Sequence, residues 1–330
     1  VNPNDYSVGY MWGTTGILYN KAYVTEEEAS SWSLMFDKRL EDKIFVKDAF
    51  RDVYSPILLY AKTLEGRANG TLGEDEYLDI DTIHELMYDS SDESIALVEG
   101  YLKRMKELVA GWEADFGKEM MTQEKAWINL MWSGDAVWAI DEASSVDVEL
   151  GYAVPAEGSV VWFDGWVIPK YARNLRAARY FIDYMCMPEN AIRNMDATGY
   201  VSVVATEEVF DALEDLSYCE QQVCDLSYLF VDSEGNPIEG SESVLADPVL
   251  YPDRRVIDRC GVMHDSGDRT DKMLEMWSRV KGDNLSVGML VGIILFFGLL
   301  LVWGVWRKVD SYRRKQKLKK RRHHSKAKAK

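Results

Sequence analysis

The chain has 330 residues, 47% of them hydrophobic, so it can bury a sizeable core and suits about two domains. Its net charge of −17 combines a basic C-terminal segment, 307–330, which holds 13 Lys and Arg against one acid, with an acidic remainder that holds 25 Lys and Arg against 54 acids. An acidic body repels nucleic acid and attracts cations, so the composition argues against DNA or RNA as a partner.

In chain order, the first half of this body is predicted to be a strand, three helices and a second strand. Residues 8–18 are mostly apolar around a central Gly-Thr-Thr, a pattern typical of a buried strand followed by a crossover. Apolar residues recurring at helical spacing predict the helices, with Asp48 as the cap of the first. The helices are expected at 48–64, 81–88 and 94–112. Residues 127–138 are predicted to be a strand that runs into a turn at 133–135.

The second half continues the alternation. Short strands are predicted at 151–155 and at 159–168, where Pro169 ends the second. Helices are predicted in three places, separated by Pro188, Gly199 and a polar loop at 232–237. They are expected at 175–187, 189–198 and 271–281. Strands that alternate with helices predict an α/β fold.

Residues 287–306 form an uncharged run of twenty residues that predicts a transmembrane helix. At ~1.5 Å per residue it spans the ~30 Å hydrocarbon core, and Trp303 and Trp306 suit the interface. The alternative, a buried core helix, is disfavoured by the length and the basic flank. The positive-inside rule places 307–330 in the cytoplasm and 1–284 outside.

The N-terminus shows no signal peptide, initiator Met or lipidation Cys, so we expect the chain to begin in mid-protein. The four cysteines are too few and too irregularly spaced for a metal framework. Cys219 and Cys224 either form a local disulfide or remain unpaired, and unpaired is the default.

Catalytic and metal motifs are absent from the sequence. Only His84 and His264 lie outside the tail, and neither belongs to a recognisable nucleophile or metal pattern. Asp135 and Asp141 flank Trp138, where a carboxylate pair on an acidic body indicates a solvated face. We therefore expect neither an enzyme nor a cofactor or metal.

Aromatic residues beside carboxylates and glycine form a more informative pattern, mostly at the ends of predicted elements, where open α/β sheets bind ligands. The residues are Trp132, Trp162, Trp166 and Tyr200 beside Asp135, Asp164 and Gly199. Ring faces pack methylenes and attract cations, and a carboxylate binds an ammonium group, so the pattern favours an aliphatic cation. The alternative is that these tryptophans belong to the core.

At these residues the sequence resembles the spermidine/putrescine-binding proteins of ABC transporters, from about Asp5 to about Lys281. Five motifs in the family's order carry the resemblance: DYSVGYMWGTTGILYN at 5–20, MWSGDA at 131–136, VPAEGSVVWFDGWVIP at 154–169, AARYFIDYMCMPENAIRNMDATGY at 177–200 and YPD at 251–253. The sequence departs from the family at 201–203, where Thr-Pro-Asn is usual, and at 263–264, near a ligand-contacting Gln. The family's N-terminal segment, which holds most of one lobe, has no counterpart here.

The resemblance implies roles for six residues. Trp162 would pack on a polyamine chain, Asp164 would bind an ammonium group, and Trp132 would form another aromatic wall. Tyr200 would close the pocket from the other lobe. Asp52 matches an acid that binds a second ammonium group, with Asp48 as its helper.

The implied fold is the two-lobed periplasmic-binding-protein type II fold, with lobe 1 largely missing, plus the transmembrane helix. The expected division is 1–13 and 165–205 for the remnant of lobe 1, 14–164 and 206–284 for lobe 2, 287–306 for the membrane helix and 307–330 for the basic cytoplasmic tail. The implied function is capture of spermidine or putrescine outside the cell and delivery to an ABC permease with a cytoplasmic ATPase. The preferred polyamine is not determined, and a permease fused upstream remains open. The alternatives are a receptor for another solute, such as a different amine or an iron complex, and a membrane-tethered sensor.

Overall fold

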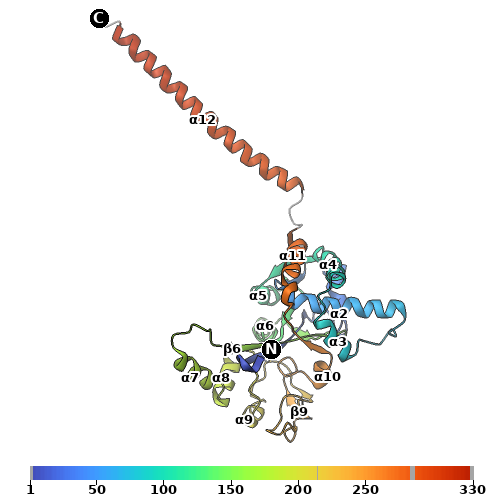
Figure 1. Ribbon diagram of the computed structural model, residues 1–330. Helices are drawn as coiled ribbons and strands as arrows, with labels where there is room; N and C mark the ends of the chain where they lie inside the picture. Colours follow the sequence, from blue (N-terminus) through green and yellow to red (C-terminus); the bar gives the residue numbers. More distant parts are fainter. Residues whose placement is uncertain (1–2, 214, 283–286, 328–330) are drawn as a thin grey trace. The chain divides into compact units, whose positions relative to one another are not determined.

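The computed structural model describes residues 3–213, 215–282 and 287–327 (Figure 1). The chain divides into two compact units, one up to Trp277 and one from Ser278 onward, and each is described by itself.

A mixed sheet with the order β10-β6-β1-β4-β2-β3 forms the frame of the first unit, and β5 and β7 also pair with β1. Strand β1 is antiparallel to β4, β5, β6 and β7, whereas β2 is parallel to β3 and β4, and β10 is parallel to β6. The strands are β1 (Ser7–Asn20), β2 (Ile44–Lys47), β3 (Val109–Glu113), β4 (Ile128–Trp132), β5 (Leu150–Ala153), β6 (Ser159–Val167), β7 (Val201–Ser202) and β10 (Cys260–Val262). A separate two-stranded sheet pairs β8 (Gln222–Cys224) with β9 (Val244–Ala246).

Helices flank this frame, with α7 and α8 together on one side of the unit and α2 and α3 on the other (Figure 1). They are α1 (Glu26–Ala29), α2 (Phe50–Asn69), α3 (Ile80–Met87), α4 (Asp92–Lys106), α5 (Gly117–Thr122), α6 (Ser133–Ser144), α7 (Leu175–Met185), α8 (Pro188–Thr198), α9 (Glu207–Asp211), α10 (Arg254–Ile257) and, up to Trp277, the first part of α11 (Thr270–Gly282). One core cluster includes Trp12 and Leu18 of β1, Met131 of β4, and Tyr251. The predicted α/β class is confirmed.

Local signals set the ends of several elements. Pro188 occupies the first turn of α8, and Gly199 ends that helix in the left-handed region at φ 71°, a conformation that suits glycine. The prediction that Asp48 caps a helix is wrong, because α2 begins after Ala49.

Two predicted boundaries are also wrong. The helix expected at 94–112 ends at Lys106, and β3 occupies Val109–Glu113. The turn expected at 133–135 is the first turn of α6, which packs its apolar face against β5 and α5. Ser-Gly-Asp suits a helix start as well as a turn, so those letters alone do not distinguish the two.

Strand β1 positions the site because it passes from one set of partners to another. Its residues up to Thr14 pair with β6, and its residues from Thr15 onward pair with β4. Trp162 therefore lies opposite Gly13, and Trp132 lies opposite Thr15. The two residues flank the step of β1, by which we mean the point between Thr14 and Thr15 where its pairing partner changes.

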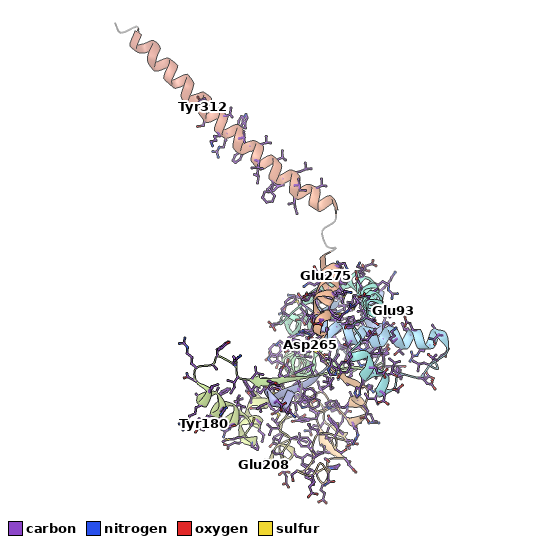
Figure 2. The ribbon with its side chains drawn as sticks, in the orientation of Figure 1. Glu93, Tyr180, Glu208, Asp265, Glu275 and Tyr312 are labelled. Carbon is purple, nitrogen blue, oxygen red and sulfur yellow. The ribbon has the colours of Figure 1, made fainter. Side chains whose placement is uncertain are left out.

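The second unit contains α12 (Val287–Ala327). Within it, Val291–Val309 is long and apolar enough to cross a membrane, judged by length and composition, and it overlaps the predicted span. Apolar side chains described along this stretch, such as Leu295 and Phe296, are exposed, as is Tyr312 beyond it (Figure 2).

Candidate functional site

A cavity of about 270 Å³ lies at the step in β1, and five of the six residues singled out in the sequence line it. They are Asp52, Trp132, Trp162, Asp164 and Tyr200. The structure thus brings together residues from α2, β4, β6 and the segment after α8.

Three aromatic rings form a continuous wall. The Trp162 ring centroid lies 6.4 Å from that of Trp132 and 5.7 Å from that of Tyr200, both in edge-on geometry. Glycine makes room for these rings: a Cβ on Gly13 would lie 2.6 Å from Trp162, and a Cβ on Gly134 would lie 2.4 Å from Tyr200. The bare backbone at these two positions therefore lets the rings approach β1 and α6.

Two carboxylates face this wall. Asp52 is only 6% exposed, and its Oδ1 accepts a hydrogen bond of 2.9 Å from Nε1 of Trp132. Burial raises the pKa of Asp52, although the Trp132 hydrogen bond and the charges of Lys47 and Arg51 oppose the increase. Burial also raises the pKa of Asp164. Both acids are held where a bound cation would lower the cost of their ionised form.

Asp135 corrects the sequence interpretation. It was expected on a solvated face, but its side chain is buried on α6. Lys47 and Lys118 contact it at 2.9 and 3.2 Å, and the Tyr200 hydroxyl donates to it at 2.9 Å. Burial alone would raise the pKa of Asp135, but Lys47 and the other donors outweigh it and hold the pKa below its usual value.

Asp48 is not among the residues that line the cavity. Its carboxylate accepts a hydrogen bond of 3.2 Å from Nε1 of Trp277. In this structure Asp48 therefore contacts Trp277 and does not line the cavity beside Asp52, where the resemblance implies that it helps to bind the ligand.

Sequence reasoning did not assign Phe163 and Met263 to the cavity, which they also line. Phe163 lies between Trp162 and Asp164 in the resembling motif, so its position beside two candidate ligand-binding residues could have assigned it to the cavity. Met263 stands near the position where the resemblance implies a ligand-contacting Gln, and it places an apolar side chain in the cavity.

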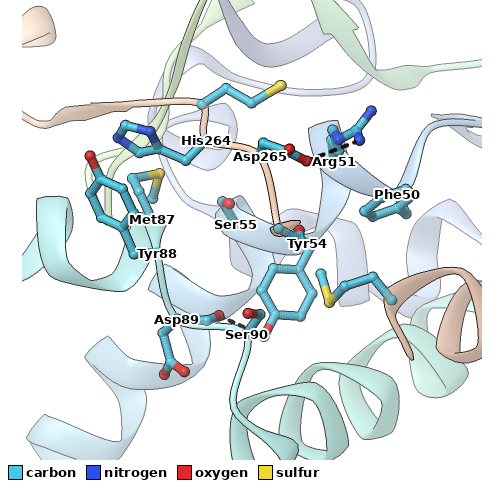
Figure 3. A pocket seen from close by; sticks show the side chains of 13 residues that line it. Phe50, Arg51, Tyr54, Ser55, Met87, Tyr88, Asp89, Ser90, His264 and Asp265 are labelled. Carbon is cyan, nitrogen blue, oxygen red and sulfur yellow. Dashed lines mark hydrogen bonds and ion pairs between the residues drawn. The ribbon is translucent and has the colours of Figure 1, made fainter. Parts of the chain in front are cut away.

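Met263 also borders a small neighbouring pocket, shown in Figure 3, that residues at the start of α2 help to line. There His264 stacks on Tyr88 with ring centroids 3.7 Å apart, and Arg51 forms an ion pair with Asp265 at 3.6 Å. Through these contacts the segment after β10, which carries Met263, packs against Tyr88 and Arg51.

A larger cavity of about 520 Å³ adjoins Phe163, with Trp12 and Tyr228 in its wall. Its lining is mostly apolar, which suits a charged amine less well than the wall beside Asp52 and Asp164 does.

The described residues include neither a candidate metal site nor a disulfide. Among those residues, no group of three or more His, Cys, Asp or Glu side chains is placed to hold a metal ion. Cys219 and Cys224 are both free thiols, which agrees with the default expectation.

Comparisons with known proteins bear on the family and the fold of the chain. Residues 1–212 match the family model described as bacterial extracellular solute-binding protein. The spermidine/putrescine-binding periplasmic protein of Escherichia coli K12 is 24% identical over 197 residues, which are 60% of this chain and 49% of that protein. The putrescine/agmatine-binding protein of Pseudomonas aeruginosa PAO1 is 24% identical over 205 residues, covering 60% of this chain and 51% of that protein. The chain thus spans about half the length of these curated relatives.

The fold is shared with solved structures. The spermidine/putrescine ABC transporter substrate-binding protein of Streptococcus pneumoniae superposes with a TM-score of 0.57 at 24% identity, covering 84% of this chain and 69% of that chain. This likeness confirms the periplasmic-binding-protein fold.

Proposed function

Because the chain belongs to the family of bacterial extracellular solute-binding proteins, we propose that its cavity captures a polyamine, spermidine or putrescine, outside the cell. The bound polyamine then passes to an ABC permease driven by a cytoplasmic ATPase. The observation that carries the proposal is the pairing of two carboxylates, Asp52 and Asp164, with three aromatic rings around one cavity.

This arrangement suits a flexible chain with an ammonium group at each end. Indole and phenol faces pack methylene groups and attract a cation by ~0.5–2 kcal/mol. Burial raises the pKa of Asp52 and so makes its ionised form costly. An ammonium group that binds there lowers this cost, because the cation replaces the lost hydration. Neutral solutes of the same size would gain the packing without the charge pairing.

In this proposal two lobes meet at the site. Residues 1–13 and 165–205 would form the remnant of lobe 1, and 14–164 and 206–284 would form lobe 2. The partner change of β1 at Thr14 and Thr15 supports this division, and Tyr200 would then reach the cavity from lobe 1. Exposed rings on α7, among them Tyr180 (Figure 2), agree with a lobe that is completed by further chain. Closure of the lobes around the ligand would be a hinge motion.

The proposed anchor is the apolar run 287–306, with the body outside the cell and 307–330 in the cytoplasm. The apolar stretch Val291–Val309 and the 13 Lys and Arg residues of the tail support this arrangement.

Isothermal titration calorimetry of the full-length protein with spermidine, putrescine and arginine tests the proposal. Binding of either polyamine at micromolar affinity is expected. Clear heat with another solute and none with either polyamine would remove the polyamine assignment.

A further inference from the structure

Lys47, the last residue of β2, is an ammonium group buried beside the cavity, with its side chain 1% exposed. Its Nζ donates to the backbone oxygen of Ala114 and to Oδ2 of Asp135, each at 2.9 Å, and lies 3.2 Å from Oε1 of Glu113. The Trp132 ring covers it, with the ring centroid 4.3 Å from Nζ. Three oxygen acceptors and an indole face therefore surround one ammonium group.

This set of groups is the one that an alkylammonium ligand needs. Carboxylates and a carbonyl accept its three N–H bonds, and an aromatic face attracts its charge. The chain thus contains a complete ammonium site, and its own lysine fills that site.

Two residues join this site to the cavity. Trp132 contacts Lys47 and also lines the cavity. Asp135 binds Lys47 through Oδ2 and accepts the hydroxyl of Tyr200, another cavity residue, through Oδ1. Of these two residues, Trp132 therefore links the ammonium group of Lys47 directly to the cavity that would hold the ligand.

We propose that Lys47 is a specificity-determining residue, because its ammonium group fills a subsite that would otherwise take a further ammonium group of the ligand. The identity of that ligand rests on the proposed function. With Lys47 in place, the cavity offers two lining carboxylates, Asp52 and Asp164, which match two ammonium groups. The carboxylates of Asp135 and Glu113 are not open to a third ammonium group, because both are paired with Lys47.

The first test needs no polyamine. Lys47→Ala removes the atoms of an n-propylammonium ion and leaves its acceptors in place. In the full chain in detergent, n-propylammonium chloride should raise the thermal unfolding midpoint of Lys47→Ala above that in sodium chloride of equal ionic strength. The midpoints of the wild type and of Lys47→Met should not respond, because methionine fills the same space without a charge. Equal responses of the two variants, or no response of Lys47→Ala, would overturn the subsite.

A folding failure remains informative. If Lys47→Ala folds only when n-propylammonium is present, the subsite is supported. If it folds under neither condition, the same comparison is made with Lys47→Ala/Glu113→Gln, which removes one of the two buried carboxylates left without the lysine. Indifference of that double variant to the amine would overturn the proposal.

The second test measures selectivity by calorimetry. The affinity for spermidine relative to that for putrescine should rise roughly tenfold or more in Lys47→Ala, because a new pairing for the third ammonium group appears. It should not rise in Lys47→Met. An unchanged ratio in Lys47→Ala would overturn the specificity role. If the wild type binds neither amine, the proposed function fails, whereas the n-propylammonium test still decides whether the subsite exists.

Discussion

The indole N–H of Trp132 donates a hydrogen bond of 2.9 Å to the carboxylate of Asp52, although 80 residues separate the two in the chain. The bond fixes the ring that ends β4 against the acid in the first turn of α2. Burial makes ionisation of Asp52 unfavourable, and this one donor offsets only part of the effect. Under the proposed function, an arriving ammonium group would offset the remaining cost of ionising Asp52.

Asp52→Asn should stabilise the ligand-free chain and weaken polyamine binding. The pKa of Asp52 is raised in the folded state, so its contribution favours folding when it is protonated and is lost as pH rises through the raised pKa. At pH 7 the ionised acid opposes folding, and asparagine removes that charge while still accepting the Trp132 bond. Thermal unfolding should show a higher midpoint, and calorimetry should show binding weaker by about 1.5 kcal/mol or more. A lower midpoint together with unchanged affinity would contradict this account.

Asp164→Asn should weaken polyamine binding by about 2 kcal/mol, because an ammonium group loses a charged acceptor. Asp141→Asn is the matched control, since Asp141 is an exposed acid on α6 and is not among the cavity residues. Calorimetry of both variants with putrescine gives the comparison. Equal affinities for the two variants would show that the site is misplaced.

Asp135→Asn should lower the free energy of unfolding by about 2 kcal/mol, because a buried carboxylate that pairs with Lys47 and Lys118 loses its charge. The lowered pKa of Asp135 means that its stabilisation is present above the usual pKa of an aspartate and is lost as pH falls through the lowered one. Urea unfolding at neutral pH measures the effect, with Asp141→Asn again as the control. A stability equal to that of the control would restore the solvated-face interpretation.

Polyamine affinity should fall on acidification, and the fall should begin above the ordinary aspartate pKa of about 3.9. Asp52 and Asp164 both have raised pKa values, and only their ionised forms pair with an ammonium group. Calorimetry with putrescine between about pH 4 and pH 7 follows the loss. Asp164→Asn should reduce the pH dependence; a profile identical to that of the wild type would assign the titration to another group.

The tail 307–330 should be cytoplasmic. Its 13 Lys and Arg residues follow an apolar stretch, and such segments stay on the cytoplasmic side. Protease added to intact cells should degrade the body and leave an epitope placed at Lys330 protected. Cleavage of that epitope from outside would invert the topology and end the import proposal.

Much of the local structure and most of the cavity could be predicted from the sequence. Strand β1 and the stop of α8 at Gly199 follow from patterns within a few residues, and those were found. The cavity residues Trp162 and Asp164 were reached through the resemblance of a contiguous motif. Met263 was not assigned to the cavity, because a methionine carries no motif and its contact depends on the path of β10.

The sequence by itself determined the α/β class and the apolar stretch of α12, because these depend on composition, periodicity and short motifs. The resemblance of the sequence to a known family added Asp52 to the candidate site. Only the tertiary structure decided what the rings and acids of that site contact. It buried Asp135 against Lys47, 88 residues away, and it placed the same lysine under Trp132. It also brought the Asp48 carboxylate into a hydrogen bond with Trp277, and Asp48 is not among the cavity residues. The physical reason is that burial and charge pairing depend on which strands become neighbours, and the step of β1 between β6 and β4 sets that arrangement across more than a hundred residues of chain.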